Sequence, residues 1–197
     1  SKGVSKSDID LLEIMAGHPR VVAIGETGLD YLRDFSPHQD QLEVLNWELA
    51  VAKKVGLPVI IHCRQAQDVI IPILRDWSIS HPLPAGKPRG VLHNFRDDLD
   101  TAKQYMAMGF CFSLGAYLGY PSSASLRKVV AELPLDKLLI ETDCPFLPPQ
   151  EYRGRRNEPG YTPITVRKLA EIKGITAEDA ARQTTINALK AFNLHLS

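Results

Sequence analysis

The chain has 197 residues, of which 44% are hydrophobic and 23% are charged, and its 23 Lys and Arg residues balance its 23 Asp and Glu residues. These proportions are ordinary for a folded globular protein and exclude disordered, collagen-like and coiled-coil chains. The zero net charge excludes a globally basic nucleic-acid binder but not a local cationic groove, and no apolar run approaches the roughly 18 residues of a membrane span, so no membrane partner is expected.

Short apolar runs alternate with amphipathic stretches along the chain. The runs cover residues 21–25, 58–61, 90–92, 110–114 and 137–140. Their nearly continuous aliphatic residues predict strands buried on both faces, as in a parallel sheet. Helices are predicted over residues 40–55, 69–77, 98–108, 123–133, 162–173 and 177–189, with Thr176 as the N-cap of the last. This alternation predicts an α/β fold with right-handed crossovers, in which residues 1–197 form a single domain.

Residue types that bind metal ions follow four of the five predicted strands, namely Glu26, His62, His93 and Asp143. The carboxyl ends of parallel strands form one functional face, so we expect these side chains to converge. Two imidazoles and two carboxylates suit Zn²⁺, Mn²⁺ or Mg²⁺. A single histidine at such a place is more often structural, and a single acid is as often a helix N-cap. Four of them at equivalent places favour a metal centre.

The three cysteines, Cys63, Cys111 and Cys144, show no C-x-x-C spacing and predict reduced thiols in a cytoplasmic protein. Cys63 and Cys144 directly follow His62 and Asp143. Because side chains alternate along a strand, they should point away from the metal centre. We expect small buried hydrophobic residues rather than nucleophiles.

Residues 152–159 form the one dense cationic stretch. It includes Arg153, Arg155 and Arg156, and tyrosines flank these arginines. A loop of this composition on the catalytic rim would suit phosphate contacts and base stacking. A solvated surface loop is the simpler alternative. Arg64, two residues after the histidine of its strand, is a second candidate for phosphate binding, although it could equally form a structural ion pair.

Several blocks of the sequence resemble the signature motifs of the TatD-related metal-dependent deoxyribonucleases, a family similar to the amidohydrolases. The blocks are Gly25–Tyr31 (GETGLDY), Pro58–Arg64 (PVIIHCR), Gly90–Phe95 (GVLHNF), Leu138–Pro145 (LLIETDCP), and the RG and RNEP of residues 153–159. They occur in family order from about Val21 to Phe192. The resemblance implies a (β/α)₈ TIM-type barrel with a binuclear metal site at the carboxyl ends of its strands.

The same resemblance implies roles for individual residues. Glu26 would bridge two divalent metal ions (Mg²⁺, Mn²⁺ or Zn²⁺), His62 and His93 would complete one of them, and Asp143 would ligate the other and accept a proton. Glu26 and Asp143 are therefore the catalytic candidates. The implied reaction is hydrolysis of DNA phosphodiester bonds, on single strands or at ends, by a water activated by two metals, and no obligate protein partner is expected. The substrate-binding candidates are Arg64, Arg153, Arg156 and Asn157.

The sequence also departs from the family pattern. Family members begin with a strand carrying His-x-His, which supplies two metal ligands, and this chain has no His-x-His. The first three strands are therefore expected to be missing from a truncated, cleaved or incompletely recorded chain, because five strands cannot close an eight-stranded barrel. Gln65, Asn94 and Arg96 stand where the family usually has Asp, Cys, and Ser or Thr.

Two other functions remain open at this point. An amidohydrolase-like site would also support ester or amide hydrolysis of a small molecule, because a metal-activated water does not select its electrophile. The chain would instead be an inactive metal-binding remnant if the missing ligands are essential. In that case Glu26, His62 and His93 would still provide three ligands, which with a water suffice for Zn²⁺.

Overall fold

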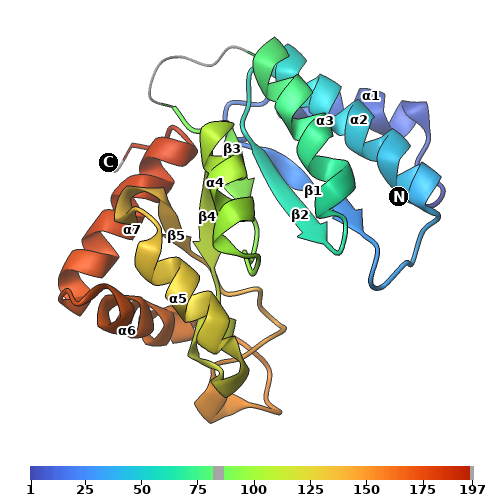
Figure 1. The fold of residues 1–197 in the computed structure, drawn as a ribbon. Coiled ribbons are helices and arrows are strands. Elements are labelled where there is room, and N and C mark those ends of the chain that lie inside the picture. Colours follow the sequence, from blue (N-terminus) through green and yellow to red (C-terminus); the bar gives the residue numbers. More distant parts are fainter. Residues whose placement is uncertain (82–86, 196–197) are drawn as a thin grey trace. The chain divides into compact units, whose positions relative to one another are not determined.

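The computed structural model describes residues 1–81 and 87–195 (Figure 1). Its strands are β1 (Ile24–Asp30), β2 (Val59–Arg64), β3 (Gly90–Leu92), β4 (Phe110–Leu114) and β5 (Leu138–Ile140). Its α-helices are α1 (Lys6–Ala16), α2 (His38–Val55), α3 (Gln67–Ser80), α4 (Leu99–Ala107), α5 (Ala124–Glu132), α6 (Thr162–Lys173) and α7 (Ala177–Ala191). Short 3₁₀ helices are η1 (Ala116–Gly119), η2 (Pro121–Ser123), η3 (Leu135–Lys137), η4 (Gln150–Tyr152) and η5 (Pro159–Tyr161).

The five strands follow the sheet order β1-β2-β3-β4-β5, and β1 with β2, β2 with β3, and β4 with β5 pair in parallel. A helix separates each strand from the next. The predicted parallel α/β fold is thereby confirmed. The described chain divides into two compact units. The first contains residues 1–93, 104–110 and the C-terminal residues from Lys190, and the second contains residues 94–103 and 111–189.

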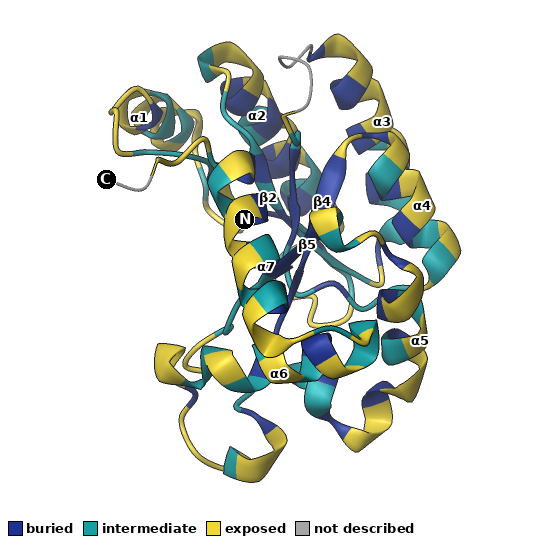
Figure 2. Ribbon diagram, turned by 90° about the vertical axis from the view of Figure 1, so that its left-hand side faces the viewer, coloured by how far each residue is buried: buried dark blue, intermediate teal, exposed yellow. Residues whose placement is uncertain are grey.

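The first unit is built on β1, β2 and β3, with their interior side chains buried (Figure 2). Leu29 of β1 and Ile61 of β2 are completely buried, and Trp77 of α3 donates its indole N–H to the carbonyl of Leu49 in α2 at 2.8 Å. Gly28 lies opposite His62 in the strand register. Close packing of β1 against β2 therefore positions the residues at this end of the two strands.

The second unit packs α5, α6 and most of α7 around β5 and most of β4. Phe112 and Leu138, opposite each other in the register, are fully buried. Asn187 of α7 is buried and donates its amide to the carbonyls of Leu135 and Leu138 at 2.8 and 2.7 Å. The helix therefore holds the start of β5 through hydrogen bonds to two backbone carbonyls.

The boundaries of two strands differ from the prediction. β1 begins later than the apolar run at 21–25 and continues through the polar motif to Asp30, and β2 continues to Arg64. Glu26 and His62 therefore lie inside strands. The prediction that they follow the strand ends is wrong. Pairing of Gly28 with His62 and of Asp30 with Arg64 extends both strands into residues that are not apolar.

The sequence prediction also missed α1. Ser5 caps this helix, accepting from the backbone N–H of Asp8 while the Asp8 carboxylate accepts from the N–H of Ser5.

No helix in the part of the chain that the structure describes is both long and apolar enough to cross a membrane.

Candidate metal centre

Three of the four predicted ligands gather in the first unit. The Nδ1 of His62 lies 2.9 Å from Oε1 of Glu26, and the Nε2 of His93 lies 3.6 Å from the same oxygen. The centroids of the two imidazole rings are 6.4 Å apart. The Glu26 side chain is 43% exposed and that of His93 is 19% exposed, so the cluster is accessible from solvent.

Asp30 is a fourth member of this cluster that the sequence analysis missed. Its Oδ2 lies 3.1 Å from Nε2 of His62 and 3.8 Å from Nη1 of Arg64, while its Oδ1 accepts the backbone N–H groups of Leu32 and Arg33. Burial acts to raise the pKa of Asp30, but the N–H of Arg33, the His62 ring and the Arg64 guanidinium outweigh it and hold the pKa below its usual value. A signal was available in the sequence, since Asp30 lies in the same motif as Glu26.

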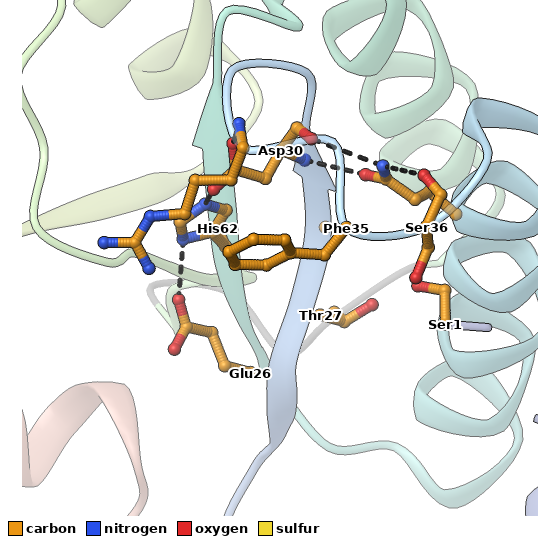
Figure 3. Close-up of a pocket in the computed structure, with 10 residues that line it drawn as sticks. Ser1, Glu26, Thr27, Asp30, Phe35, Ser36 and His62 are labelled. Atoms are coloured by element: carbon orange, nitrogen blue, oxygen red, sulfur yellow. Dashed lines mark hydrogen bonds and ion pairs between the residues drawn. The ribbon is translucent and has the colours of Figure 1, made fainter.

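A pocket of about 250 Å³ opens beside these side chains. Figure 3 shows the His62 ring between the carboxylates of Glu26 and Asp30, with the Phe35 ring directed into the pocket toward it. Arg33 and Phe35 line the pocket from the loop between β1 and α2. A ligand entering this pocket would meet the His62 imidazole, the carboxylates of Glu26 and Asp30, and the Arg33 guanidinium.

The donor set can be tested against the chemistry of a divalent cation. One carboxylate and two imidazoles are suitable ligands, and a carboxylate on the far nitrogen of a histidine, as Asp30 provides for His62, is the usual support of a metal-ligating imidazole. The side chains of Glu26 and His62 are hydrogen-bonded to each other. Among the described residues, no group of three His, Cys, Asp or Glu side chains is arranged to hold a metal ion. The donor chemistry fits, and the site itself stays a prediction.

Asp143, the fourth predicted ligand, belongs to the second unit. It follows β5 with a φ of 56°, and its Oδ2 accepts the side-chain N–H of Asn94 at 3.0 Å. The backbone N–H of Asn94 lies 3.1 Å from Oε2 of Glu141, to which the Ser113 hydroxyl donates. Hydrogen bonds thus fix the residues after β4 and β5, and convergence of Asp143 with the other three predicted ligands stays a prediction.

The predicted substrate-binding residues differ in their surroundings. Arg153 and Arg156 are exposed. Arg64 forms an ion pair with Asp30, in agreement with the alternative prediction of a structural ion pair. Asn157 is buried, and its amide donates to the carbonyls of Thr142, Phe146 and Leu147. Its side chain therefore holds the loop after β5 together, and we assign it this positioning role in place of a substrate contact.

Among the described residues no cysteine forms a disulfide, and the three cysteines differ in burial. Cys111 is buried, Cys63 is half-buried and Cys144 is exposed. The expectation that Cys63 and Cys144 are small buried residues is therefore wrong. Cys63 lies near the end of β2, and Cys144 lies in the loop that follows β5.

Comparison with known proteins bears on this site. A sequence model of the family described as TatD related DNase matches residues 2–193. The chain is 39% identical over 192 residues to the protein named uncharacterized metal-dependent hydrolase YabD of Bacillus subtilis, covering 98% of this chain and 73% of that protein. It is 37% identical to the 3'-5' ssDNA/RNA exonuclease TatD of Erwinia tasmaniensis, covering 93% of this chain and 70% of that protein.

Solved structures show the same relationship. The crystal structure of YJJV, a TatD homologue from Escherichia coli K12, matches with a TM-score of 0.86 at 30% identity, covering 98% of this chain and 72% of that one. A hydrolase of the TatD family from Entamoeba histolytica matches with a TM-score of 0.80 at 25% identity, covering 97% and 69% of the two chains. On its motifs, its parallel α/β fold and these matches, the chain belongs to the TatD related DNase family of metal-dependent hydrolases.

Proposed function

We propose that the chain carries the metal-dependent site of a deoxyribonuclease that hydrolyses phosphodiester bonds in single-stranded DNA or at DNA ends. The observation that carries this proposal is the solvent-accessible cluster of Glu26, His62 and His93, with Asp30 behind His62 and a pocket beside it. The name of the Erwinia relative, an ssDNA/RNA exonuclease, supports a nucleic-acid substrate.

Each residue has a defined part in this proposal. Glu26, His62 and His93 would hold one divalent metal ion, and Asp143 together with Glu26 would serve a second. Bound metal ions supply electrostatic activation of the phosphoryl group and of water. Asp30 orients His62 through its Nε2, and Asp143 is the proposed proton acceptor.

Phosphate binding falls to the arginines. Arg153 and Arg156 are exposed and carry planar guanidinium groups, which bind phosphate oxygens in pairs. Arg64 already forms an ion pair with Asp30. A phosphate contact would therefore be a second interaction of the same guanidinium. We therefore expect Arg153 and Arg156 to contribute more than Arg64. The lack of a disulfide among the described cysteines supports the cytoplasm as the proposed compartment.

The test is degradation of single-stranded DNA labelled at its 3' or 5' end, with Mg²⁺ or Mn²⁺, by the wild-type chain and by His93→Ala. We expect the substitution to lower the rate of cleavage by a factor of roughly 100 or more, which is typical of substitutions at metal sites. The reason is that it removes one of the three clustered metal donors. His18→Ala is the matched control, since His18 is exposed and its ring accepts the nearby N–H of Arg20.

The remaining outcomes separate the alternatives. Undiminished cleavage by His93→Ala would contradict the site. Turnover of simple esters without cleavage of DNA or RNA would favour a small-molecule hydrolase. Metal binding without turnover of any of these substrates would favour an inactive remnant.

A further inference from the structure

Two arginines of the second unit are stacked on two tyrosines that contact each other. The guanidinium carbon of Arg96 lies 4.0 Å from the centroid of the Tyr117 ring, and that of Arg153 lies 4.7 Å from the Tyr120 ring. The two tyrosine rings meet edge to face with centroids 5.1 Å apart. The four side chains form a continuous row, here named the tyrosine–arginine ladder, that joins the loop after β3 to the loop after β5.

The ladder is connected to a predicted catalytic residue. The Nε–H of Arg96 donates to Oδ1 of Asn94 at 3.2 Å, and Nδ2 of Asn94 donates to Oδ2 of Asp143 at 3.0 Å. Asn94 and Arg96 are two of the positions at which the sequence departs from the usual family pattern. The ladder therefore extends from Asp143 through a pair of residues that the family signature does not assign.

The tyrosines are fixed by their surroundings. Tyr120 is buried and donates its hydroxyl to the carbonyl of Pro148 at 2.6 Å, and its own carbonyl accepts from Arg127. The carbonyl of Tyr117 accepts from Ser123. A guanidinium resting on a fixed ring loses less rotamer freedom when it binds a ligand, because the ring already restricts its stem.

The positions of the charges suit a row of phosphates. The Arg153 guanidinium lies over the Tyr120 ring, and a guanidinium contacts a ring through its face, which leaves N–H groups at its edge for an anion. Arg153 is exposed, and within the described residues it has no carboxylate within ion-pair distance. Tyr117 is only half-buried, so its ring is also accessible. Cationic groups interleaved with aromatic rings are typical of surfaces that bind single-stranded nucleic acid.

We propose that the tyrosine–arginine ladder is a binding track for single-stranded nucleic acid, in which Arg96 and Arg153 each contact a backbone phosphate beside Asp143. The proposal rests on the proposed function for its substrate class. It adds Arg96, Tyr117 and Tyr120 to the binding residues and gives each a separate role: the arginines supply charge, and the tyrosines hold the arginines in place.

The test measures binding rather than turnover. Fluorescence anisotropy of a labelled oligothymidylate is recorded with the full chain in EDTA, over a series of NaCl concentrations. Each lost phosphate contact reduces the slope of log K against log salt by about 0.7 for single strands. Arg96→Gln should weaken binding by about five-fold to ten-fold and reduce the slope by about that amount.

The tyrosine variants distinguish positioning from charge. Tyr117→Leu removes the ring but no charge, so it should weaken binding by about three-fold while leaving the salt slope unchanged. Tyr117→Phe keeps the ring and should bind like the wild type. Arg155→Gln is the matched control, because Arg155 is exposed in the same cationic segment but lies outside the ladder. Its affinity and salt slope should stay near wild type.

Specific results would overturn the ladder. They are no binding of oligothymidylate by the wild type, the same loss in Arg155→Gln as in Arg96→Gln, or wild-type binding by Tyr117→Leu. Thermal unfolding of each variant checks folding, and Arg96→Lys, which keeps the charge, should retain the salt slope. Since these experiments contain no metal, failure of the proposed nuclease activity with intact ladder binding would be seen separately.

Discussion

A single glycine illustrates how closely the strands approach beside the candidate metal centre. Gly28 has a φ of 146°, and a Cβ added to it would lie 1.8 Å from the carbonyl oxygen of His62. The obstacle is backbone rather than a flexible side chain, so a substitution must push β1 and β2 apart. The register that brings Glu26 to His62 therefore depends on the absence of a side chain at Gly28.

Gly28→Ala should lower the free energy of unfolding by about 3 kcal/mol or more, because it adds both a backbone clash and an unfavourable φ. Urea unfolding followed by circular dichroism measures the change. Gly160→Ala is the control, since a Cβ there meets nothing within 4 Å. Equal stability of the two variants would show that β1 and β2 are not packed as described.

Asp30 couples the candidate metal centre to the loop after β1, and the two oxygens have separate roles. Asp30→Asn can keep an oxygen for the N–H groups of Leu32 and Arg33 but loses the negative charge behind His62. We expect Mn²⁺ affinity to fall by about 10-fold to 100-fold, with little change in stability. Isothermal titration calorimetry with Mn²⁺ measures this, and Asp98→Asn, in a residue that caps α4, serves as control. An unchanged Mn²⁺ affinity would contradict the supporting role of Asp30.

At the scale of elements, the end of α3 contains a buried ionisable side chain. His81 is 3% exposed and stacks on Trp77 with ring centroids 4.7 Å apart. Burial lowers its pKa, and the positive charges of Arg89 and Lys53 lower it further. The folded protein thus favours the neutral ring.

The lowered pKa of His81 makes the stability of the folded chain depend on pH. The unfolded chain binds a proton near pH 6.5, whereas the folded chain binds it only at lower pH. Stability from His81 is therefore complete above about pH 6.5 and is lost as the pH falls from there through the folded pKa. Urea unfolding at about pH 7.5 and pH 5.5 should show a larger loss for the wild type than for His81→Phe, which keeps the stacking but cannot titrate. An equal loss in both proteins would exclude His81 as the cause.

The helices and strands show what hydrophobic patterning can establish. The predicted bounds of β3, β4 and α6 agree with the structure, and the predicted Thr176 cap is confirmed by its hydrogen bond from the N–H of Asp179. Patterning failed for β1, whose extent is set by pairing with β2 through polar residues. Patterning also failed for α1. Its apolar residues Leu11, Ile14 and Met15 are exposed, so they do not mark a buried face of the helix.

For the whole molecule, the sequence predicted that Glu26, His62 and His93 would lie close together, because parallel strands end at a common edge, although Glu26 and His62 lie inside their strands rather than after them. It did not establish the hydrogen-bond arrangement around them. The pairing of His62 with Asp30 depends on the strand register, and the burial of Asn157 depends on how the loop after β5 folds back on itself. Such details follow from three-dimensional packing, which residue type and spacing do not specify.

Metal binding should also be linked to the stability of the whole chain. Glu26 and His62 are 36 residues apart in sequence, so the unfolded chain does not hold them together. An ion that binds only the folded state at about 100 times its Kd adds about 2.7 kcal/mol to the free energy of unfolding. For a chain of this length that corresponds to a rise of about 5 to 10 °C in Tm. Mn²⁺ should therefore raise the Tm of the wild type, and EDTA should reverse the shift.

The variants decide whether this stabilisation arises at the proposed site. His93→Ala removes one of the donors near Glu26 and should abolish most of the Mn²⁺-dependent rise in Tm, whereas His18→Ala should keep it. A rise that persists in His93→Ala would place the ion elsewhere on the molecule. No rise in the wild type would mean that the three clustered side chains do not bind the ion tightly on their own, because linkage converts any selective binding of the folded state into stability. Metal-dependent hydrolysis by this chain would then require ligands from outside the cluster.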